Sequence, residues 1–134
     1  MSHYCWNDNN NLFAWLIIDE VPGHYLVDVE MKKVDFVSGV DDGHPSHIFG
    51  VRYITDRYVG SRLGSAILQA EIIDLDNQSI VPLVKLSHPA IINSANRCDM
   101  HISLSRDKKL YQLDSRHLYN RRTVLIGTLP PLKC

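Results

Sequence analysis

A regular alternation of apolar and polar side chains over residues 25–32 constrains the fold more than any other feature of this sequence. The apolar positions are Tyr25, Val27, Val29 and Met31, and most of the positions between them are polar. Side chains two residues apart lie on the same face of a β-strand, so the pattern predicts a strand with one face toward a core. We therefore expect a chain built mainly from antiparallel strands and short turns.

The residues around this run predict a hairpin. Residues 12–18 are apolar on both faces and predict a buried strand. Pro22-Gly23 predicts the turn between the two strands, because proline fixes φ and glycine tolerates positive φ. After Lys32-Lys33 the apolar phase shifts by one residue, which indicates either a β-bulge or the end of one strand and the start of another. Residues 12–37 are thus predicted to form an antiparallel hairpin.

Several later segments also predict strands. Residues 48–55, 100–104 and 123–128 are short, apolar and bounded by turn residues. Residues 60–76 match both a helical and a strand pattern, and both remain open, with a strand favoured for at least 70–75.

A second hairpin is predicted around residues 76–79, which are polar and lead into residues 80–86. Pro82 has no N–H to donate to a strand ladder, so we expect 80–86 to lie at the edge of a sheet.

One helix is predicted over residues 107–118, where Leu110, Leu113, His117 and Leu118 recur at helical spacing. The fold class predicted from these elements is α+β. It consists of a mostly antiparallel, strongly curved β-sheet or small barrel-like sheet with one or two short helices. A chain of 134 residues fits one domain over 1–134, with the polar residues 1–11 as a mobile lead-in.

The charge of the chain limits the classes of partner. The net charge is −1, so no overall field attracts nucleic acid or a membrane. The balance is uneven, because residues 1–96 carry 6 Lys+Arg and 12 Asp+Glu, whereas residues 97–134 carry 8 and 3. The first apolar run is too short to cross a bilayer, and the three cysteines form no Cys-x-x-Cys pair. We expect a cytoplasmic protein without a membrane partner or a cofactor.

The segment His101-Ile102-Ser103-Leu104 contains the first candidate for chemistry. On a strand, His101 and Ser103 share one face, where the imidazole can move a proton and the hydroxyl can hold a phosphate oxygen. The segment resembles half of the signature of the 2H phosphoesterases, which carry two such motifs across a cleft and act on phosphodiesters, commonly in RNA. That resemblance implies catalytic roles for His101 and Ser103, with Arg106 or Lys108 steadying phosphate.

The second motif that this family requires is incomplete here. His44-Pro45-Ser46 matches the His-x-Ser pattern, but a proline such as Pro45 is disfavoured inside a central strand. The same loop contains His47, so that His44 and His47 form a His-x-x-His pair and are weak candidates for metal ligands beside acidic residues. We assign no metal site from these residues alone.

The third candidate is a basic segment over residues 106–122. Its cations can neutralise phosphates, and its rings can stack on unpaired bases, so it predicts a ligand- or nucleic-acid-binding surface. The residues are Arg106, Lys108, Lys109, Tyr111, Arg116, His117, Arg121 and Arg122.

The function expected from the sequence is therefore that of a small, non-enzymatic binding or accessory domain. It would act on a protein or a small-molecule ligand, with a homodimer through the edge strand at 80–86 as one arrangement. Two alternatives remain. One is a phosphodiester-cleaving enzyme that uses His101 and Ser103, and the other is a nucleic-acid-binding module that uses residues 106–122.

Overall fold

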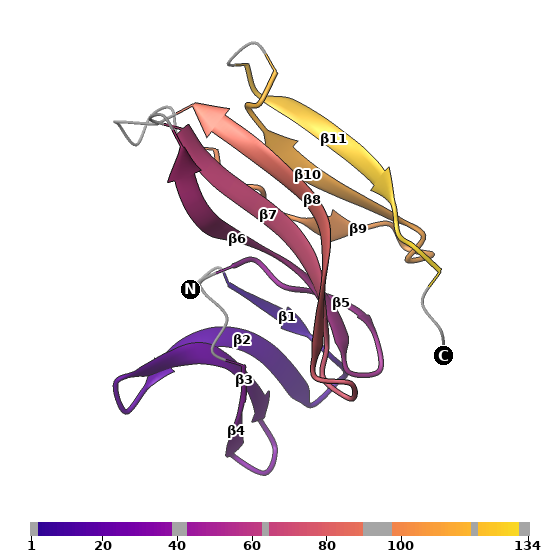
Figure 1. The fold of residues 1–134 in the computed structure, drawn as a ribbon. Coiled ribbons are helices and arrows are strands. Elements are labelled where there is room, and N and C mark those ends of the chain that lie inside the picture. The colour runs from indigo at the N-terminus through magenta and orange to yellow at the C-terminus, as the bar shows by residue number, and fades with distance from the viewer. Residues whose placement is uncertain (1–2, 39–42, 63–64, 90–97, 119–120, 132–134) are drawn as a thin grey trace.

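The protein consists of strands and turns. The computed structural model describes residues 3–38, 43–62, 65–89, 98–118 and 121–131, and within these ranges it contains no helix. The strands form three antiparallel sheets, none of which closes into a barrel (Figure 1). The predicted α+β class, with one or two short helices on a barrel-like sheet, is therefore wrong.

The sheets follow the order of the chain. The first contains β1 (Tyr4–Trp6), β2 (Asn11–Ile18), β3 (Val21–Asp28) and β4 (Lys33–Ser38) in that order. The second contains β5 (Ser46–Phe49), β6 (Arg52–Arg62), β7 (Ser65–Asp74) and β8 (Ser79–Pro89). The third contains β9 (Ser103–Leu104), β10 (Leu110–Ser115) and β11 (Thr123–Thr128), with β10 in the middle. Within each sheet, every strand thus pairs with its neighbours in sequence.

The segment predicted as the helix 107–118 forms a turn followed by β10. Leu113 is 1% exposed and Ser115 is fully buried, whereas Leu110 and Gln112 on the other face are exposed. This is the period-two burial of a strand, and β10 pairs with β11 along its whole length. The helical spacing of the leucines was therefore misleading, because pairing with distant strands decided the structure.

The hairpin predicted over residues 12–37 is confirmed as β2 and β3, but its turn lies elsewhere. Pro22-Gly23 lies inside β3, and the chain reverses at Asp19 and Glu20, whose φ angles are 49° and 66°. Two consecutive positive φ values fit the right-handed twist of a two-residue hairpin. The phase shift after Lys32 marks the start of a new strand, β4.

In the second sheet, the two patterns over residues 60–76 are resolved in favour of strands, since β6 and β7 pair across this region. The hairpin between β7 and β8 is confirmed, and β8, which contains Pro82, lies at the sheet edge as expected. The single strand predicted over 48–55 is divided by a turn at Gly50, whose φ is 56°.

Packing between the sheets includes a shared apolar cluster and a stack of aromatic rings. A buried cluster joins the second and third sheets, and it includes Ile54, Leu68, Ile72, Met100 and Leu113. The first sheet packs against the second through stacked rings of Phe13 and Tyr53, with centroids 3.7 Å apart. The segment 3–6, expected to belong to a mobile lead-in, includes β1, which pairs with β2. No helix long and apolar enough to cross a membrane occurs in the part of the chain that the structure describes.

Within the first sheet, His24 is buried without polar partners. Its side chain is fully buried and stacks on Phe13, and neither ring nitrogen has a hydrogen-bond partner in the structure. Burial, with a smaller contribution from the nearby His3, lowers the pKa of His24 to about 4. An imidazole in such a site is neutral at pH 7, and charging it costs folding free energy.

We predict that His24 makes the protein less stable in mild acid. The pKa of His24 is about 4 in the folded state, and an unfolded histidine has a pKa of about 6.5. The unfolded chain therefore binds more protons in this window, and stability falls as the pH drops from about 6.5 toward 4. His24→Phe should flatten this dependence and raise the unfolding free energy at pH 7 by about 1 kcal/mol. Denaturant unfolding at several pH values measures both effects, and an unchanged slope in the variant would contradict the prediction.

Candidate functional site

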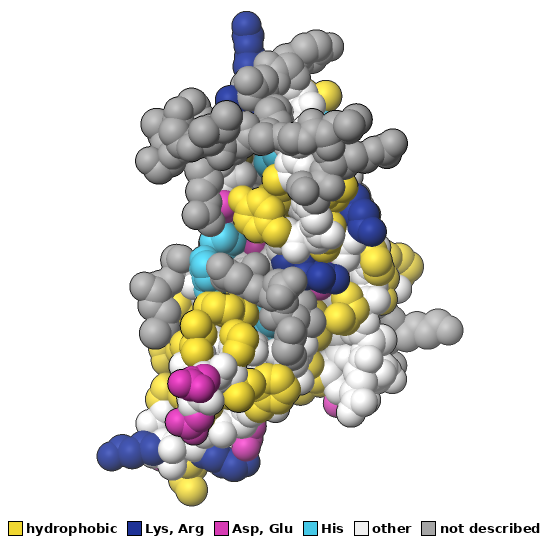
Figure 2. All heavy atoms as spheres, turned by 60° about the vertical axis from the view of Figure 1, so that its left-hand side comes forward, with side chains coloured by type: hydrophobic (Ala, Val, Ile, Leu, Met, Phe, Trp, Pro, Cys, Tyr) yellow, Lys and Arg dark blue, Asp and Glu magenta, His cyan; other side chains and the backbone are white. Residues whose placement is uncertain are grey.

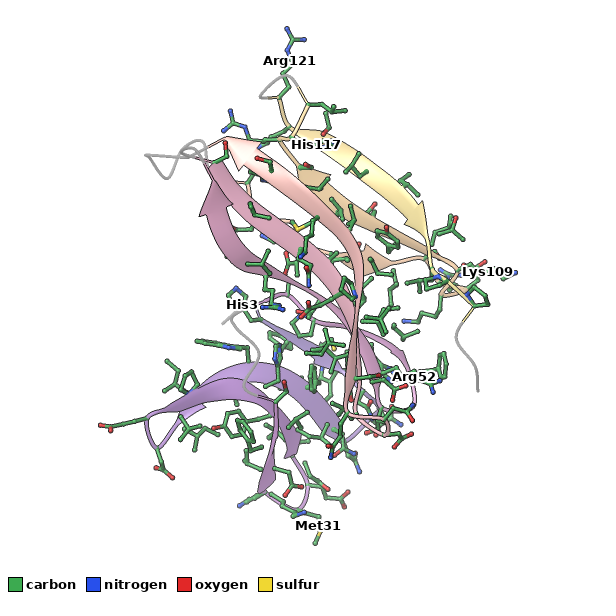
Figure 3. All side chains as sticks on the ribbon, viewed as in Figure 1. His3, Met31, Arg52, Lys109, His117 and Arg121 are labelled. Carbon is green, nitrogen blue, oxygen red and sulfur yellow. The ribbon has the colours of Figure 1, made fainter. Side chains whose placement is uncertain are left out.

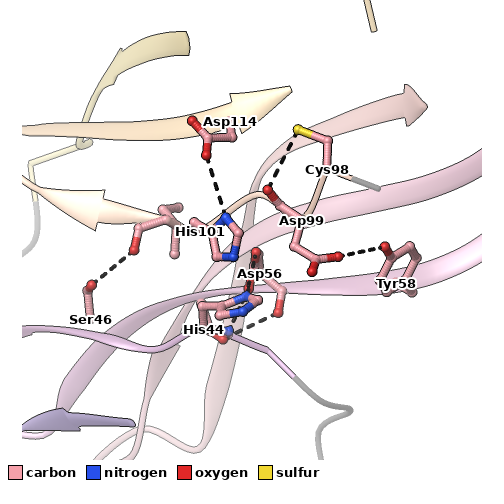
Figure 4. Close-up of polar contacts among 10 residues, drawn as sticks. His44, Ser46, Asp56, Tyr58, Cys98, Asp99, His101 and Asp114 are labelled. Atoms are coloured by element: carbon pink, nitrogen blue, oxygen red, sulfur yellow. Dashed lines mark hydrogen bonds and ion pairs between the residues drawn. The ribbon is translucent and has the colours of Figure 1, made fainter. Parts of the chain in front are cut away.

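Three segments that lie far apart in the sequence meet close to β10. They are the loop before β5, the middle of β6, and the segment before β9 (Figure 4). The rings of His44 and His101 lie 4.6 Å apart, centroid to centroid. One ligand atom from each of His44, Asp99 and His101 can be chosen so that all three atoms lie within 4.8 Å of one another. These three residues form the candidate site.

The loop that carries His44 is fixed by close contact with β6. A Cβ at Gly43 would lie 1.8 Å from the backbone oxygen of Asp56, so only glycine fits at this position. The backbone N–H of His44 donates to Oδ1 of Asp56. The same carboxylate lies 2.9 Å from Nδ1 of His44, and it is 5% exposed. Because a carboxylate has no proton to donate, Nδ1 carries the hydrogen and Nε2 keeps its lone pair.

His101 is held by its neighbours in the chain. Met100 and Ile102 are buried in the core, whereas the His101 side chain is 56% exposed, and its backbone φ is 43°. The predicted alternation of burial is therefore present, although the regular strand begins only at Ser103. Nδ1 of His101 lies 3.5 Å from Oδ2 of Asp114 on β10. This carboxylate favours the same tautomer as in His44, with the lone pair on Nε2.

The third member, Asp99, also has a partner that orients it. The hydroxyl of Tyr58 on β6 donates to Oδ1 of Asp99 at 3.0 Å. The neighbouring thiol, Cys98, is buried and lies 3.9 Å from the backbone oxygen of Asp99. Burial and the nearby Asp114 raise the pKa of this thiol, so Cys98 is protonated at neutral pH in the metal-free protein.

The spacing of the two histidines favours one of two kinds of chemistry. Bracketing one phosphate by hydrogen bonds requires two imidazoles separated by about 6–8 Å. Around a zinc ion, nitrogen and oxygen ligands lie at about 2.0–2.2 Å, so any two of them are about 3–4 Å apart. The separations of at most 4.8 Å among His44, Asp99 and His101 are closer to the second arrangement.

The structure brings together only part of the residues proposed from the sequence. His101 and His44 meet, but Ser103 lines a different pocket, beside Leu104 and Tyr111. His47 is not in this group of ligand atoms, and its Nε2 lies 3.0 Å from the backbone oxygen of Gly50. The hydroxyl of Ser46 donates to the backbone oxygen of Ile102 at 3.1 Å, so it joins the two histidine segments rather than facing a ligand.

The basic segment 106–122 does not form one surface. Its basic residues lie at the two ends of β10, as Lys109 at one end and His117 and Arg121 at the other show (Figure 3). Lys108 donates from Nζ to the backbone oxygen of His47. Tyr111 packs over Gly127, where a Cβ would lie 2.3 Å from the ring.

Sequence reasoning missed several residues of the site. Asp99 lies two positions before His101, and this Asp-x-His spacing was the available signal. Asp56, Asp114 and Tyr58 carry no recognisable local motif, because each acts only through a residue from a distant segment.

The site lies at the surface. Figure 2 shows histidine side chains exposed on this face, beside acidic and hydrophobic side chains. A small pocket here is lined by His3, His44, Tyr58 and Asp99, among other residues. Comparisons with protein-family models, with curated proteins and with solved structures found no match to this chain.

Proposed function

We propose that this chain is a binding domain whose ligand is a divalent metal ion held by His44, Asp99 and His101. One observation carries the proposal: each of the three candidate ligands has an outer partner, which is Asp56, Tyr58 or Asp114. Metal-binding histidines almost always place the second ring nitrogen against a carboxylate or a carbonyl, which fixes the ring and raises its basicity. The same arrangement occurs twice here.

The chemistry of the ligand set favours zinc. Two imidazoles and one carboxylate suit zinc and other late first-row metals, whereas magnesium and calcium prefer oxygen ligands alone. The sequence led us to expect a domain that binds a protein or a small-molecule ligand and has no metal site; the proposal keeps a binding role but makes a metal ion the ligand. We place the protein in a reducing cytoplasm, in agreement with the free thiols of Cys5 and Cys98.

Metal titration of the chelator-treated protein tests the proposal. We expect one Zn²⁺ per chain by calorimetry, and loss of roughly a hundredfold or more in affinity in His44→Ala, Asp99→Asn and His101→Ala. Removing an outer partner of a metal ligand typically lowers metal affinity by about 10–100-fold. These variants remove a ligand itself, so we expect a loss at or above the upper end of that range. His47→Ala is the matched control, since it removes a histidine from the same loop but outside the site.

Equal affinity in the control and in the three variants would refute the proposal, as would the absence of binding in the wild type. Circular dichroism of each metal-free variant separates a lost ligand from a lost fold.

Phosphodiester cleavage remains the second candidate, because the two His-x-Ser segments meet at His44 and His101. It predicts cleavage of labelled single-stranded RNA in the presence of a chelator, with loss of activity in His101→Ala. If the protein leaves the RNA intact while control cleavage reactions without chelator are active, phosphodiester cleavage is ruled out. Only the metal-binding role then remains.

A further inference from the structure

We infer that His3 is a fourth ligand of this metal, and that the metal links all three sheets. The inference rests on the proposed metal site. It adds a ligand from a segment that no motif indicated, and it assigns the site to the closed, structural class.

The position of His3 carries the first step. The His3 ring lies 4.3 Å from that of His44, edge to face at 79°. His3 and Asp99 line the same small pocket, which also includes His44 and Tyr58. A rotation about the side-chain torsions of His3 moves its ring nitrogens by a few ångströms and leaves the backbone in place. As the ring stands, His3 lies outside the group of ligand atoms within 4.8 Å of one another, so it would reach an ion bound between His44 and Asp99 through this rotation.

The backbone of His3 is already anchored. Its carbonyl oxygen accepts a hydrogen bond from the Trp15 N–H at 2.8 Å, which extends the pairing of β1 and β2. The His3 ring also packs at 6.4 Å from the indole of Trp15. Holding the ring in place thus costs little additional backbone entropy when the metal binds.

A fourth protein ligand changes what the site does. Zinc sites with three protein ligands keep a position for water and are typical of catalysis, whereas four protein ligands close a structural site. With His3, the set becomes three imidazoles and one carboxylate. The expected role is therefore retention of the metal and stabilisation of the fold, with no coordination position for an exogenous ligand.

The four ligands come from all three sheets. His3 precedes β1 of the first sheet, and His44 precedes β5 of the second. Asp99 and His101 precede β9 of the third. His3 lies where the first sheet approaches the second (Figure 3). A metal held by all four therefore connects the sheets at one point, and its binding free energy adds to the stability of their arrangement.

The test uses the full chain loaded with Co²⁺, whose visible spectrum reports coordination number. In the wild type we expect the intense spectrum of a tetrahedral site, unchanged on addition of azide. In His3→Ala we expect an affinity about tenfold or more lower, comparable with the loss of an outer partner. The variant should also give a spectrum that azide perturbs, because a coordination position has opened. Free imidazole should restore the wild-type spectrum in His3→Ala.

Failure of the inference is distinguishable from failure of the proposed function. If Co²⁺ binds the wild type and His3→Ala equally, and azide perturbs both spectra, the site has three ligands and the inference is wrong. If Co²⁺ does not bind the wild type, the proposed function fails first. His47→Ala again serves as the control, and it should match the wild type in every measurement.

Discussion

Replacing Phe13 with alanine should cost about 3–5 kcal/mol of folding free energy, the range for removing a buried phenylalanine. Phe13 is fully buried, and its ring lies between those of Tyr53 and His24, at centroid distances of 3.7 and 5.0 Å. The first of these contacts joins two sheets, so the variant leaves a cavity at their interface. Because small domains are stable by about 5–15 kcal/mol, the loss removes a large fraction of the total.

Urea unfolding followed by tryptophan fluorescence measures this loss. Phe36→Ala is the matched control, because Phe36 lies on β4 of the same sheet but is 55% exposed. We expect a change below about 1 kcal/mol in the control, since surface substitutions rarely exceed half that value. Similar losses in the two variants would show that the stack of rings does not hold the first sheet in place.

The second large effect concerns a charge buried between strands. Glu71 on β7 is fully buried, and its Oε1 accepts a hydrogen bond from Nε of Arg57 at 2.8 Å. Its other oxygen accepts from the side-chain amide of Gln69. Arg57→Met would remove the positive partner and leave the carboxylate in the interior. Breaking a buried pair in this way typically costs about 3–5 kcal/mol, and we expect about 3 here because the arginine is partly exposed.

A second substitution separates the charge from the packing. Glu71→Gln in the Arg57→Met background removes the buried charge, so it should recover part of the lost stability, and a double-mutant cycle gives the coupling. The control is Lys33→Met, which breaks the exposed pair with Asp35 and should cost less than about 1 kcal/mol. A double variant that is less stable than Arg57→Met would contradict this explanation.

The parts of the fold that local patterns determine were predicted from the sequence. The hairpin between β7 and β8 and the edge position implied by Pro82 are both present. The alternation over residues 25–32 predicted the strand correctly only as far as Asp28, because the chain then turns and leaves Val29 and Met31 exposed instead of in a core. The predicted helix over 107–118 failed because Leu110, Leu113 and Leu118 fit a helical period by coincidence. Pairing of β10 with β9 and β11, which no local pattern encodes, decided the outcome.

The candidate site was predictable only in part, for a related reason. His44 and His101 each stood out, one as a weak metal candidate and the other within a phosphoesterase-like motif. Nothing in the sequence indicates that they lie 4.6 Å apart, because their meeting depends on how separate sheets pack. Asp56 and Asp114 were overlooked for the same reason, since a carboxylate on a strand reveals its role only when its partner is known.

The pairing of strands with their sequence neighbours inside each sheet also implies an order of assembly. Hairpins such as β2–β3 and β6–β7 close over short loops, so each sheet can form early and at low entropic cost. His3, His44 and His101 meet only when the finished sheets dock. We therefore expect the geometry of the proposed metal site to form last during folding, so that a chain with full β-structure can still lack this site.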